Sequence, residues 1–209
     1  MKIAVIGANG KAGKLIVAEA LSRNLDVTAV VRGENKSDAK KVIVKDIMSL
    51  TKDDLKDFDV VIDCFGAWTP ETLPLHTTTS QHLCDALSGA DTRLLIIGGA
   101  GSLYLDKTHT TQVFQTKDFP AEYLPTAAAQ SAELDELRKR NDVKWTFVSP
   151  AGDFQPEGER TGKYILAGEE FTLNDKGESI ISYADYAVAM VDEATKGNHI
   201  QQRISVLKK

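Results

Sequence analysis

The 209-residue chain has only two cysteines, Cys64 and Cys84, which stand far apart and outside any C-x-x-C pattern. A disulfide framework or a cysteine-ligated zinc site would need more cysteines or a closer spacing. The histidines show no pair four residues apart that would place two ligands on one helical face. We therefore expect two reduced core thiols and no metal site.

The sequence also lacks long apolar runs and any concentration of positive charge. No segment approaches the length of a membrane span, and the N-terminal residues lead into a strand-like segment without the apolar region of a signal peptide. The formal net charge is -5, and lysines are interspersed with carboxylates instead of forming a basic stripe. These absences predict a cytoplasmic protein that acts on a small molecule and binds neither nucleic acid nor membrane.

What the sequence does contain is a regular alternation of short β-branched runs and amphipathic segments. Strands are expected at residues 2–6, 26–31, 42–44, 60–62, 94–97, 145–148 and 204–206. Helices are expected at residues 11–22, 51–55, 79–87, 127–140 and from Ser182 to about Lys196. This alternation predicts an α/β fold of the Rossmann type, with a doubly wound parallel sheet.

The pattern changes after Pro150, where recurrent glycines divide the chain into short pieces. The length exceeds the usual single domain, yet no linker separates two halves. We therefore expect one domain of the Rossmann type over residues 1–209, with a core (1–150) and a small C-terminal lobe on the substrate side (151–209). The segment Ser182–Asp185 resembles a capping box that begins the last helix.

A glycine-rich loop follows the first predicted strand and opens the first predicted helix. Its glycines are suited to a tight turn (Gly7), close approach of a pyrophosphate (Gly10) and close helix packing (Gly13). The spacing is G-x-x-G-x-x-G instead of G-x-G-x-x-G, and the alternative is a simple chain reversal. The context favours a dinucleotide site on the helix N-terminus. The candidate cofactor-binding residues here are Gly7, Asn9, Gly10, Lys11, Ala12 and Gly13; Asn9 either orders the loop or is only a turn former.

The residue after the second strand favours one cofactor over the other. An acidic residue there would bind the ribose hydroxyls of NAD, but this chain has Arg32. A guanidinium can donate two charge-assisted hydrogen bonds to a 2′-phosphate. We therefore expect NADP(H), with NAD(H) as the alternative, unless Arg32 merely ends a strand in solvent. Lys11 or Lys36 could add positive charge.

Two further groups of candidates follow the third and fourth strands. Ligands of open α/β sheets bind at the carboxyl ends of the strands. Each of these positions could equally be a loop or core residue, because position alone supports the inference. The remaining candidate cofactor-binding residues are Asp46, Ile47, Cys64, Phe65 and Gly66.

With these features in view, the chain resembles the atypical short-chain dehydrogenase/reductase superfamily. More narrowly, it is similar to the NADH-flavin reductase group of bacterial NAD(P)-binding proteins, which is like the biliverdin reductase B type. The motifs that carry the resemblance are Ile6–Gly13, Phe65-Gly66-Ala67, Ile97–Leu103 and Ser149-Pro150-Ala151. It covers essentially the whole chain, and it implies a Rossmann fold and an NAD(P)H-dependent reductase.

One departure from the superfamily bears on the chemistry. The usual dehydrogenases of the superfamily have a Tyr-x-x-x-Lys pair, in which the lysine lowers the pKa of the tyrosine for proton transfer. In this chain no tyrosine has a lysine four residues later. The resemblance places Ser102 where the superfamily serine orients the substrate or stabilises charge, so Ser102 is the catalytic candidate; the alternative is a turn residue.

Three functions remain open. Hydride transfer to a free flavin, or to another flat conjugated acceptor, depends mainly on positioning and needs no tyrosine acid. Four aromatic residues could line a floor for such a substrate, or could simply pack in the core: Tyr104, Phe114, Tyr123 and Phe154. The main alternative is a non-catalytic NADP(H)-binding redox sensor similar to regulators of the NmrA type. Epimerase or dehydratase activity is less favoured, because those relatives retain the tyrosine–lysine pair.

Overall fold

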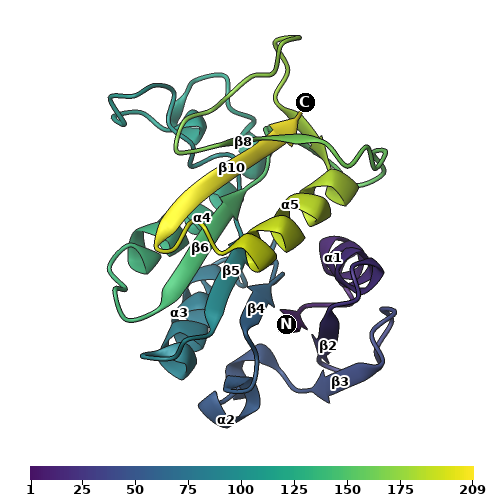
Figure 1. Cartoon of the computed structure of the whole chain (residues 1–209). Helices are drawn as coiled ribbons and strands as arrows, with labels where there is room; N and C mark the ends of the chain where they lie inside the picture. The colour runs from purple at the N-terminus through teal and green to yellow at the C-terminus, as the bar shows by residue number, and fades with distance from the viewer.

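The computed structural model describes residues 1–209, in which strands and helices alternate from the first residues onward (Figure 1). Three 3₁₀ turns, at Ile47–Ser49, Val113–Gln115 and Ala121–Tyr123, stand between them. The strands and α-helices in chain order are β1 (Lys2–Ile6), α1 (Lys11–Ser22), β2 (Asp26–Val31), β3 (Lys41–Val44), α2 (Lys52–Leu55), β4 (Val60–Asp63), α3 (Leu75–Leu87), β5 (Arg93–Ile97), α4 (Leu124–Leu137), β6 (Lys144–Ser149), β7 (Asp153–Gln155), β8 (Tyr164–Ala167), β9 (Ile180–Ser182), α5 (Tyr183–Lys196) and β10 (Gln202–Lys208).

The main sheet has eight strands in the order β3-β2-β1-β4-β5-β6-β10-β8. All neighbours pair in parallel except β10 and β8, which are antiparallel. The first six strands have the order of a dinucleotide-binding Rossmann fold, in which the direction of strand progression reverses between β1 and β4. The predicted doubly wound parallel sheet is thus confirmed, and its ligand crevice is expected at the carboxyl ends of these two strands.

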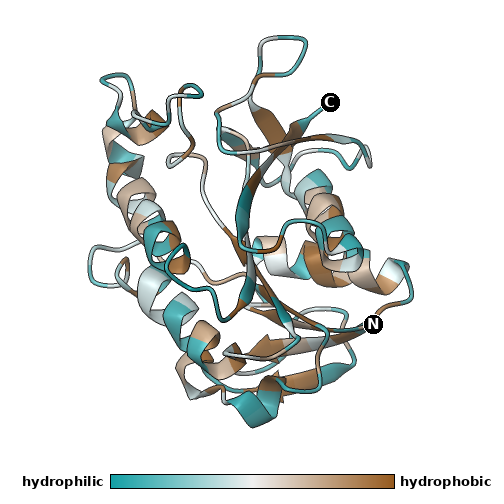
Figure 2. Ribbon diagram, turned by 60° about the vertical axis from the view of Figure 1, so that its left-hand side comes forward, coloured by the Kyte–Doolittle hydropathy of each residue, from teal (hydrophilic) through white to brown (hydrophobic).

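Helices cover both faces of the sheet, and apolar strands lie between them (Figure 2). In β1, Ile3 and Val5 belong to the core shared with α1 and α5, whereas Ala4 and Ile6 belong to the core shared with α3 and α4. Successive side chains of a strand point to opposite faces, so a strand buried on both faces must be apolar throughout. This burial explains why the central strands could be identified from their sequence.

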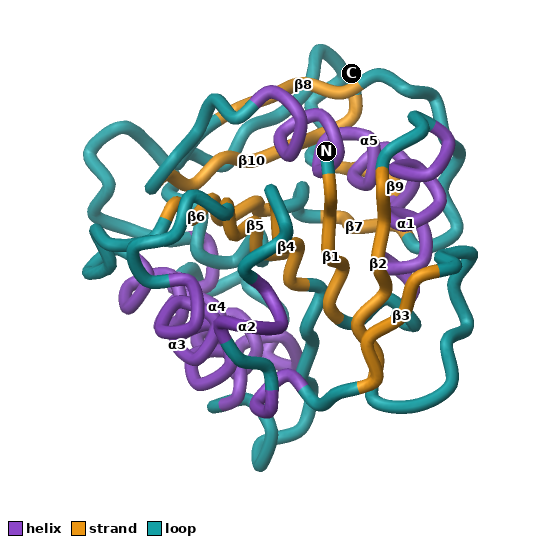
Figure 3. The backbone as a smooth tube through the Cα atoms, turned by 60° about the horizontal axis from the view of Figure 1, so that its bottom comes forward, coloured by secondary structure: helices purple, strands orange, loops and turns teal.

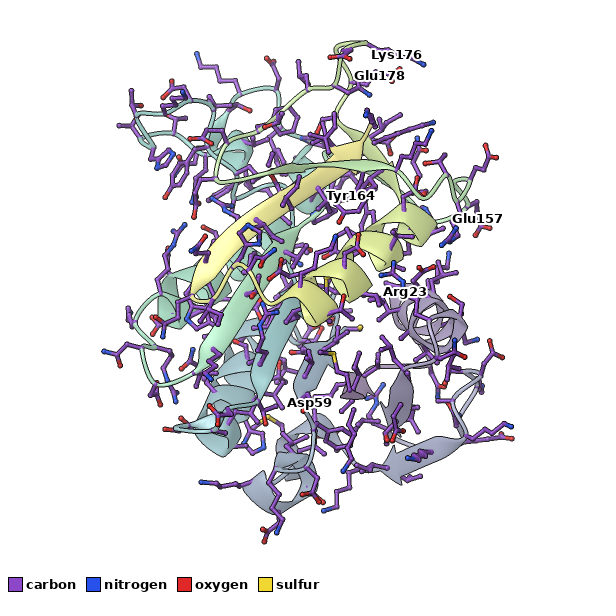
Figure 4. The ribbon with its side chains drawn as sticks, viewed as in Figure 1. Arg23, Asp59, Glu157, Tyr164, Lys176 and Glu178 are labelled. Carbon is purple, nitrogen blue, oxygen red and sulfur yellow. The ribbon has the colours of Figure 1, made fainter.

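The residues after Pro150 contribute both to the main layers and to short peripheral strands. β10 pairs with β6 in the sheet, and α5 packs beside α1 on one face. Two short strands, β7 and β9, form a separate parallel pair (Figure 3). Arg23, which follows α1, and Tyr164 of β8 lie on either side of α5 (Figure 4), and both bind Asp192 of that helix, at 2.8 Å and 2.7 Å.

Two helices begin three or four residues before their predicted starts. α3 begins at Leu75 instead of Thr79, because burial of His76 and a bond from Thr79 Oγ1 to the Leu75 carbonyl (2.7 Å) outweigh the low helix propensity of threonine. α4 spans Leu124–Leu137 instead of 127–140. Its Pro125 lies in the first turn, where no N–H is required, so the helix starts before the proline and not after it.

The predicted capping box at the start of α5 is only half formed. Ser182 Oγ accepts a bond from the Asp185 N–H (3.0 Å), as expected for an N-cap. The Asp185 carboxylate does not return a bond to Ser182 but accepts bonds from Thr161 and Gly162. It therefore holds the loop between β7 and β8 against the start of α5. None of the helices combines the length and apolar character that a bilayer crossing requires.

Candidate functional site

The loop between β1 and α1 has a backbone that only glycine allows at two positions. Gly7 has a φ of +70°, and a Cβ there would lie 2.8 Å from the Cys64 carbonyl oxygen. A Cβ at Gly13 would lie 2.4 Å from the carbonyl oxygen of Gly7. The Gly10 N–H donates to the same carbonyl, at 2.9 Å. The loop is therefore a tight turn closed against its own helix.

The first turn of α1 presents unpaired backbone donors. Gly10 is the N-cap and supplies no side-chain acceptor, and the turn contains no acidic residue. The N–H groups of Lys11, Ala12 and Gly13 have no acceptor within the chain, whereas Lys14 N–H bonds to the Gly10 carbonyl. Free amides together with the positive end of the helix dipole form an anion-binding position.

A cleft of about 1260 Å³ opens along the carboxyl ends of β1, β2, β4, β5 and β6. Pockets for single small molecules are usually about 300–1,000 Å³, so this cleft has room for a dinucleotide and part of a second molecule. The structure brings all twelve residues predicted to bind the cofactor into its wall: Gly7, Asn9, Gly10, Lys11, Ala12, Gly13, Arg32, Asp46, Ile47, Cys64, Phe65 and Gly66.

At one end of the cleft, Arg32 follows β2 with an exposed guanidinium that makes no hydrogen bond or ion pair in the chain. Asn9 joins the glycine loop to the segment after Arg32: its Nδ2 donates to the Glu34 carbonyl (2.8 Å), and its Oδ1 accepts from Lys36 N–H (2.6 Å). Asn9 therefore orders both loops. Asp46 accepts from the Met48 N–H (2.9 Å) and so caps the short turn after β3.

Three buried titratable side chains, Asp63, His76 and Glu133, lie near the segment that follows β4. Burial raises the pKa of Asp63 to about 6, although its Oδ1 accepts a bond from the Phe65 N–H (2.9 Å). Burial also lowers the pKa of His76 and, with the charge of Asp63, raises the pKa of Glu133 well above its usual range. His76 Nε2 lies 3.2 Å from the Ala67 carbonyl oxygen, so a neutral His76 that donates there anchors the segment to α3.

In the segment after β5 only Ser102 was predicted as a site residue, whereas the residues of this segment in the cleft wall include Gly98, Gly99 and Gly101. A Cβ at Gly98 would lie 2.1 Å from the Phe147 ring, and one at Gly99 would lie 2.1 Å from Gln130 Oε1. These glycines let β6 and α4 approach the strand end closely. Their position after a buried strand was the available signal, the same one that identified the residues after β4.

The structure does not bring Ser102 into the cleft. Its side chain is buried, with 1% exposure, and its Oγ lies 3.2 Å from Arg203 Nη1. Arg203 also binds Glu169 and lies over the Tyr104 ring at 5.5 Å. Ser102 thus belongs to a buried network that fixes the loop after β5, because that loop turns its hydroxyl inward.

The predicted aromatic floor is present only in part. Tyr123 and Phe154 line the cleft, whereas Tyr104 stacks on His109 (4.6 Å between ring centroids) and Phe114 packs near Gly101, both outside its wall. Four aromatic lining residues were not predicted: Trp68, Phe119, Phe171 and Tyr183. They come from loops and from the start of α5, where no periodic pattern marks them. No three histidine, cysteine or acidic side chains converge on a possible metal site.

Strand order, glycine loop and free helix N-terminus together define a dinucleotide-binding protein of the Rossmann type. Residues 7–195 match the model of the NAD(P)H-binding family. The chain belongs to this family.

Known relatives agree with this assignment. A Streptococcus pneumoniae TIGR4 protein, provisionally described as an NADH-flavin reductase, has a crystal structure that is 60% identical, covers 100% of both chains and superposes with a TM-score of 0.98. The uncharacterized protein YwnB of Bacillus subtilis strain 168 is 45% identical over 99% of this chain and 98% of its own. An oxidoreductase of Pestalotiopsis microspora, GME11367, is 24% identical over 98% of this chain and 84% of its own. The predicted resemblance to NAD(P)-binding proteins of the NADH-flavin reductase group is thus confirmed, and two of these relatives are named as a reductase or an oxidoreductase.

Proposed function

We propose that this chain transfers hydride from NADPH to a flat, conjugated small-molecule acceptor, with free flavin as the first candidate. The observation that carries the proposal is the cleft itself. It runs from the free amides of α1 to a wall rich in aromatic side chains, and no tyrosine–lysine pair exists in the chain. A site of this kind can bind and orient two flat molecules, but it lacks the Tyr-x-x-x-Lys pair that protonates a carbonyl substrate.

The residues fit the cofactor at three points. The amides of Lys11, Ala12 and Gly13 would bind the diphosphate, and Arg32, free of other partners, would bind the 2′-phosphate. The segments after β4, β5 and β6 would flank the nicotinamide. NADPH would supply the hydride, and solvent would supply the one proton that completes the reduced acceptor. The chain's contribution is therefore to hold the two rings in contact.

The name of the Streptococcus pneumoniae relative supports flavin as the acceptor. The absence of a Tyr-x-x-x-Lys pair also suits the alternative, a redox sensor that binds NADP(H) without turnover, and one experiment separates the two. Purified protein is mixed with NADPH under anaerobic conditions and with FMN, FAD, quinones or linear tetrapyrroles in turn, and NADPH oxidation is followed by absorbance. Turnover with at least one flat acceptor is expected. Equal, tight binding of NADP⁺ and NADPH with no turnover would contradict the reductase and favour the sensor.

A further inference from the structure

Helix α4 contributes two polar side chains to the wall of the cleft, Thr126 and Gln130. Residues four apart lie one above the other on the same helical face, so both groups point to the same part of the site. Neither side chain makes a hydrogen bond within the chain, whereas the adjacent Ser131 donates to Gln112 Oε1 at 3.1 Å. Gln130 is half-buried, and its amide is therefore held in the cleft wall with its hydrogen-bonding groups available.

The Gln130 amide lies against the segment after β5. A Cβ at Gly99 would lie 2.1 Å from Oε1 and 3.0 Å from Cδ of Gln130, so the amide occupies the space that any larger residue at position 99 would fill. A Cβ at Gly101 would likewise lie 2.6 Å from the Cβ of Ala127, which is the residue after Thr126 in α4. Two glycines thus let α4 pack onto the end of β5 and leave the space that the Gln130 amide occupies.

The position of Gln130 within the cleft favours contact with the acceptor. In the strand order, β2 with Arg32 and β5 with Gly99 lie on opposite sides of β1 and β4. A dinucleotide that extends from Arg32 across the N-terminus of α1 has its nicotinamide on the β5 side. The aromatic lining residues Tyr123 and Phe154 belong to the same cleft. A flat molecule bound there would have Gln130 as a polar neighbour among apolar surfaces.

We propose that Gln130 selects the acceptor, and that the acceptor is a flat heterocycle with an N–H beside a carbonyl on one edge. A primary amide has one carbonyl acceptor and an NH₂ donor, so it can form two parallel hydrogen bonds with such an edge. A buried polar group that pairs with a ligand also rejects analogues in which the pair cannot form. This inference rests on the proposed function, since it names the substrate class of the same site.

A matched pair of ligands tests the inference. Lumiflavin carries the N–H edge, and 3-methyllumiflavin has the same ring system with that N–H replaced. Binding of each to the NADP⁺-saturated protein is followed by flavin fluorescence, and turnover with NADPH gives KM and kcat separately. For the unmodified protein we expect lumiflavin to bind about tenfold more tightly than its methylated analogue, because one good hydrogen bond is lost.

Variants then assign the preference to Gln130. Gln130→Leu should weaken lumiflavin binding about tenfold, abolish the discrimination and leave the NADPH dissociation constant within twofold. Gly99→Ala should act in the same direction because its Cβ displaces the amide. Ala128→Leu, on the exposed side of the same helix, is the control and should change neither ligand's affinity.

The outcomes separate the two proposals. Equal affinity of the unmodified protein for both flavins, no flavin binding, or discrimination that survives in Gln130→Leu would overturn the role of Gln130. A loss of NADPH affinity in Gln130→Leu with unchanged flavin affinity would overturn it too, because Gln130 would then contact the cofactor. Selective flavin binding that depends on Gln130 but is accompanied by no turnover would support the recognition site and contradict the reductase alone.

Discussion

Arg32 is the residue on which the choice of cofactor depends. Its guanidinium lies exposed at the end of β2, lines the cleft and has no partner in the chain. We predict that Arg32→Asp weakens NADPH binding at least tenfold, which is a loss of about 1.4 kcal/mol or more of binding free energy. NADH binding should change less, because only NADPH offers a 2′-phosphate. Titration calorimetry with both nucleotides measures the difference.

The matched control is Lys40→Asp. Lys40 is an exposed cation in the segment between β2 and β3, but it does not line the cleft, so the same change of net charge there should leave the NADPH affinity nearly constant. Equal losses in both variants would mean that long-range charge, and not a contact with Arg32, accounts for the effect.

The buried carboxyl of Asp63 should make the stability of the protein depend on pH. Burial raises its pKa from 3.8 to about 6, so between these values the folded chain holds a proton that the unfolded chain releases. The stability contributed by this proton is complete below about pH 4 and is lost as pH rises through about 6, an effect on the order of 3 kcal/mol. Asp63→Asn keeps an oxygen acceptor for the Phe65 N–H and removes the charge.

We therefore expect Asp63→Asn to be more stable than the unmodified chain at pH 7 and to show a flatter profile between pH 4 and 7. Urea unfolding at several pH values gives the free energies of unfolding. Asp53→Asn, at an exposed position, serves as the comparison and should leave the profile unchanged. Parallel profiles for the Asp63 variant and the unmodified chain would show that the buried carboxyl does not titrate in this range.

Among the elements, the β1–α1 loop is constrained by contacts between its own backbone atoms. A Cβ at Gly13 would meet the Gly7 carbonyl oxygen at 2.4 Å, and neither atom belongs to a flexible side chain. Gly13→Ala should displace the loop and weaken NADPH and NADH binding alike, by more than tenfold. Gly168→Ala, where the added Cβ makes only an ordinary 3.9 Å contact, is the control. Circular dichroism verifies that both variants remain folded.

The loop between β7 and β8 is held to the start of α5 by a buried carboxylate. Asp185, with 1% exposure, accepts bonds from the Thr161 N–H (2.8 Å), the Gly162 N–H (2.7 Å) and Thr161 Oγ1 (2.6 Å). Asp185→Ala leaves these donors unpaired and should cost about 3 kcal/mol of stability. Ser182→Ala removes only the N-cap and one loop contact and should cost about 1 kcal/mol. A smaller loss for Asp185→Ala than for Ser182→Ala, in urea unfolding, would contradict this assignment.

The elements differ in how far the sequence predicts them. β1, α1 and β2 have their predicted bounds, because buried β-branched runs and a glycine loop are local signals. β8 was not predicted, since its pairing with β10 joins residues about forty positions apart and leaves a mixed burial pattern in its own sequence. β7 and β9 have three residues each, too few to show a period.

At the scale of the whole molecule, the parallel strand order brings the carboxyl ends of β1, β2, β4, β5 and β6 together at one end of the sheet. This is why cofactor candidates assigned by their position after a strand all line the cleft. The positions of Gln130 and Phe171 there could not be predicted in the same way, because α4 and the segment after β8 reach the cleft through tertiary packing. For the same reason, the inward turn of Ser102 was not foreseeable from its neighbours in sequence.

The most direct test of the account is titration calorimetry of the unmodified chain and of Gly13→Ala with NADPH, NADP⁺, NADH and NAD⁺. If the free amides of α1 bind a diphosphate, the unmodified chain should bind one nucleotide per chain, with NADPH tighter than NADH, and Gly13→Ala should lose most of its affinity for all four. Absence of saturable binding for every one of these nucleotides to the unmodified chain would contradict the cofactor site and the function built on it.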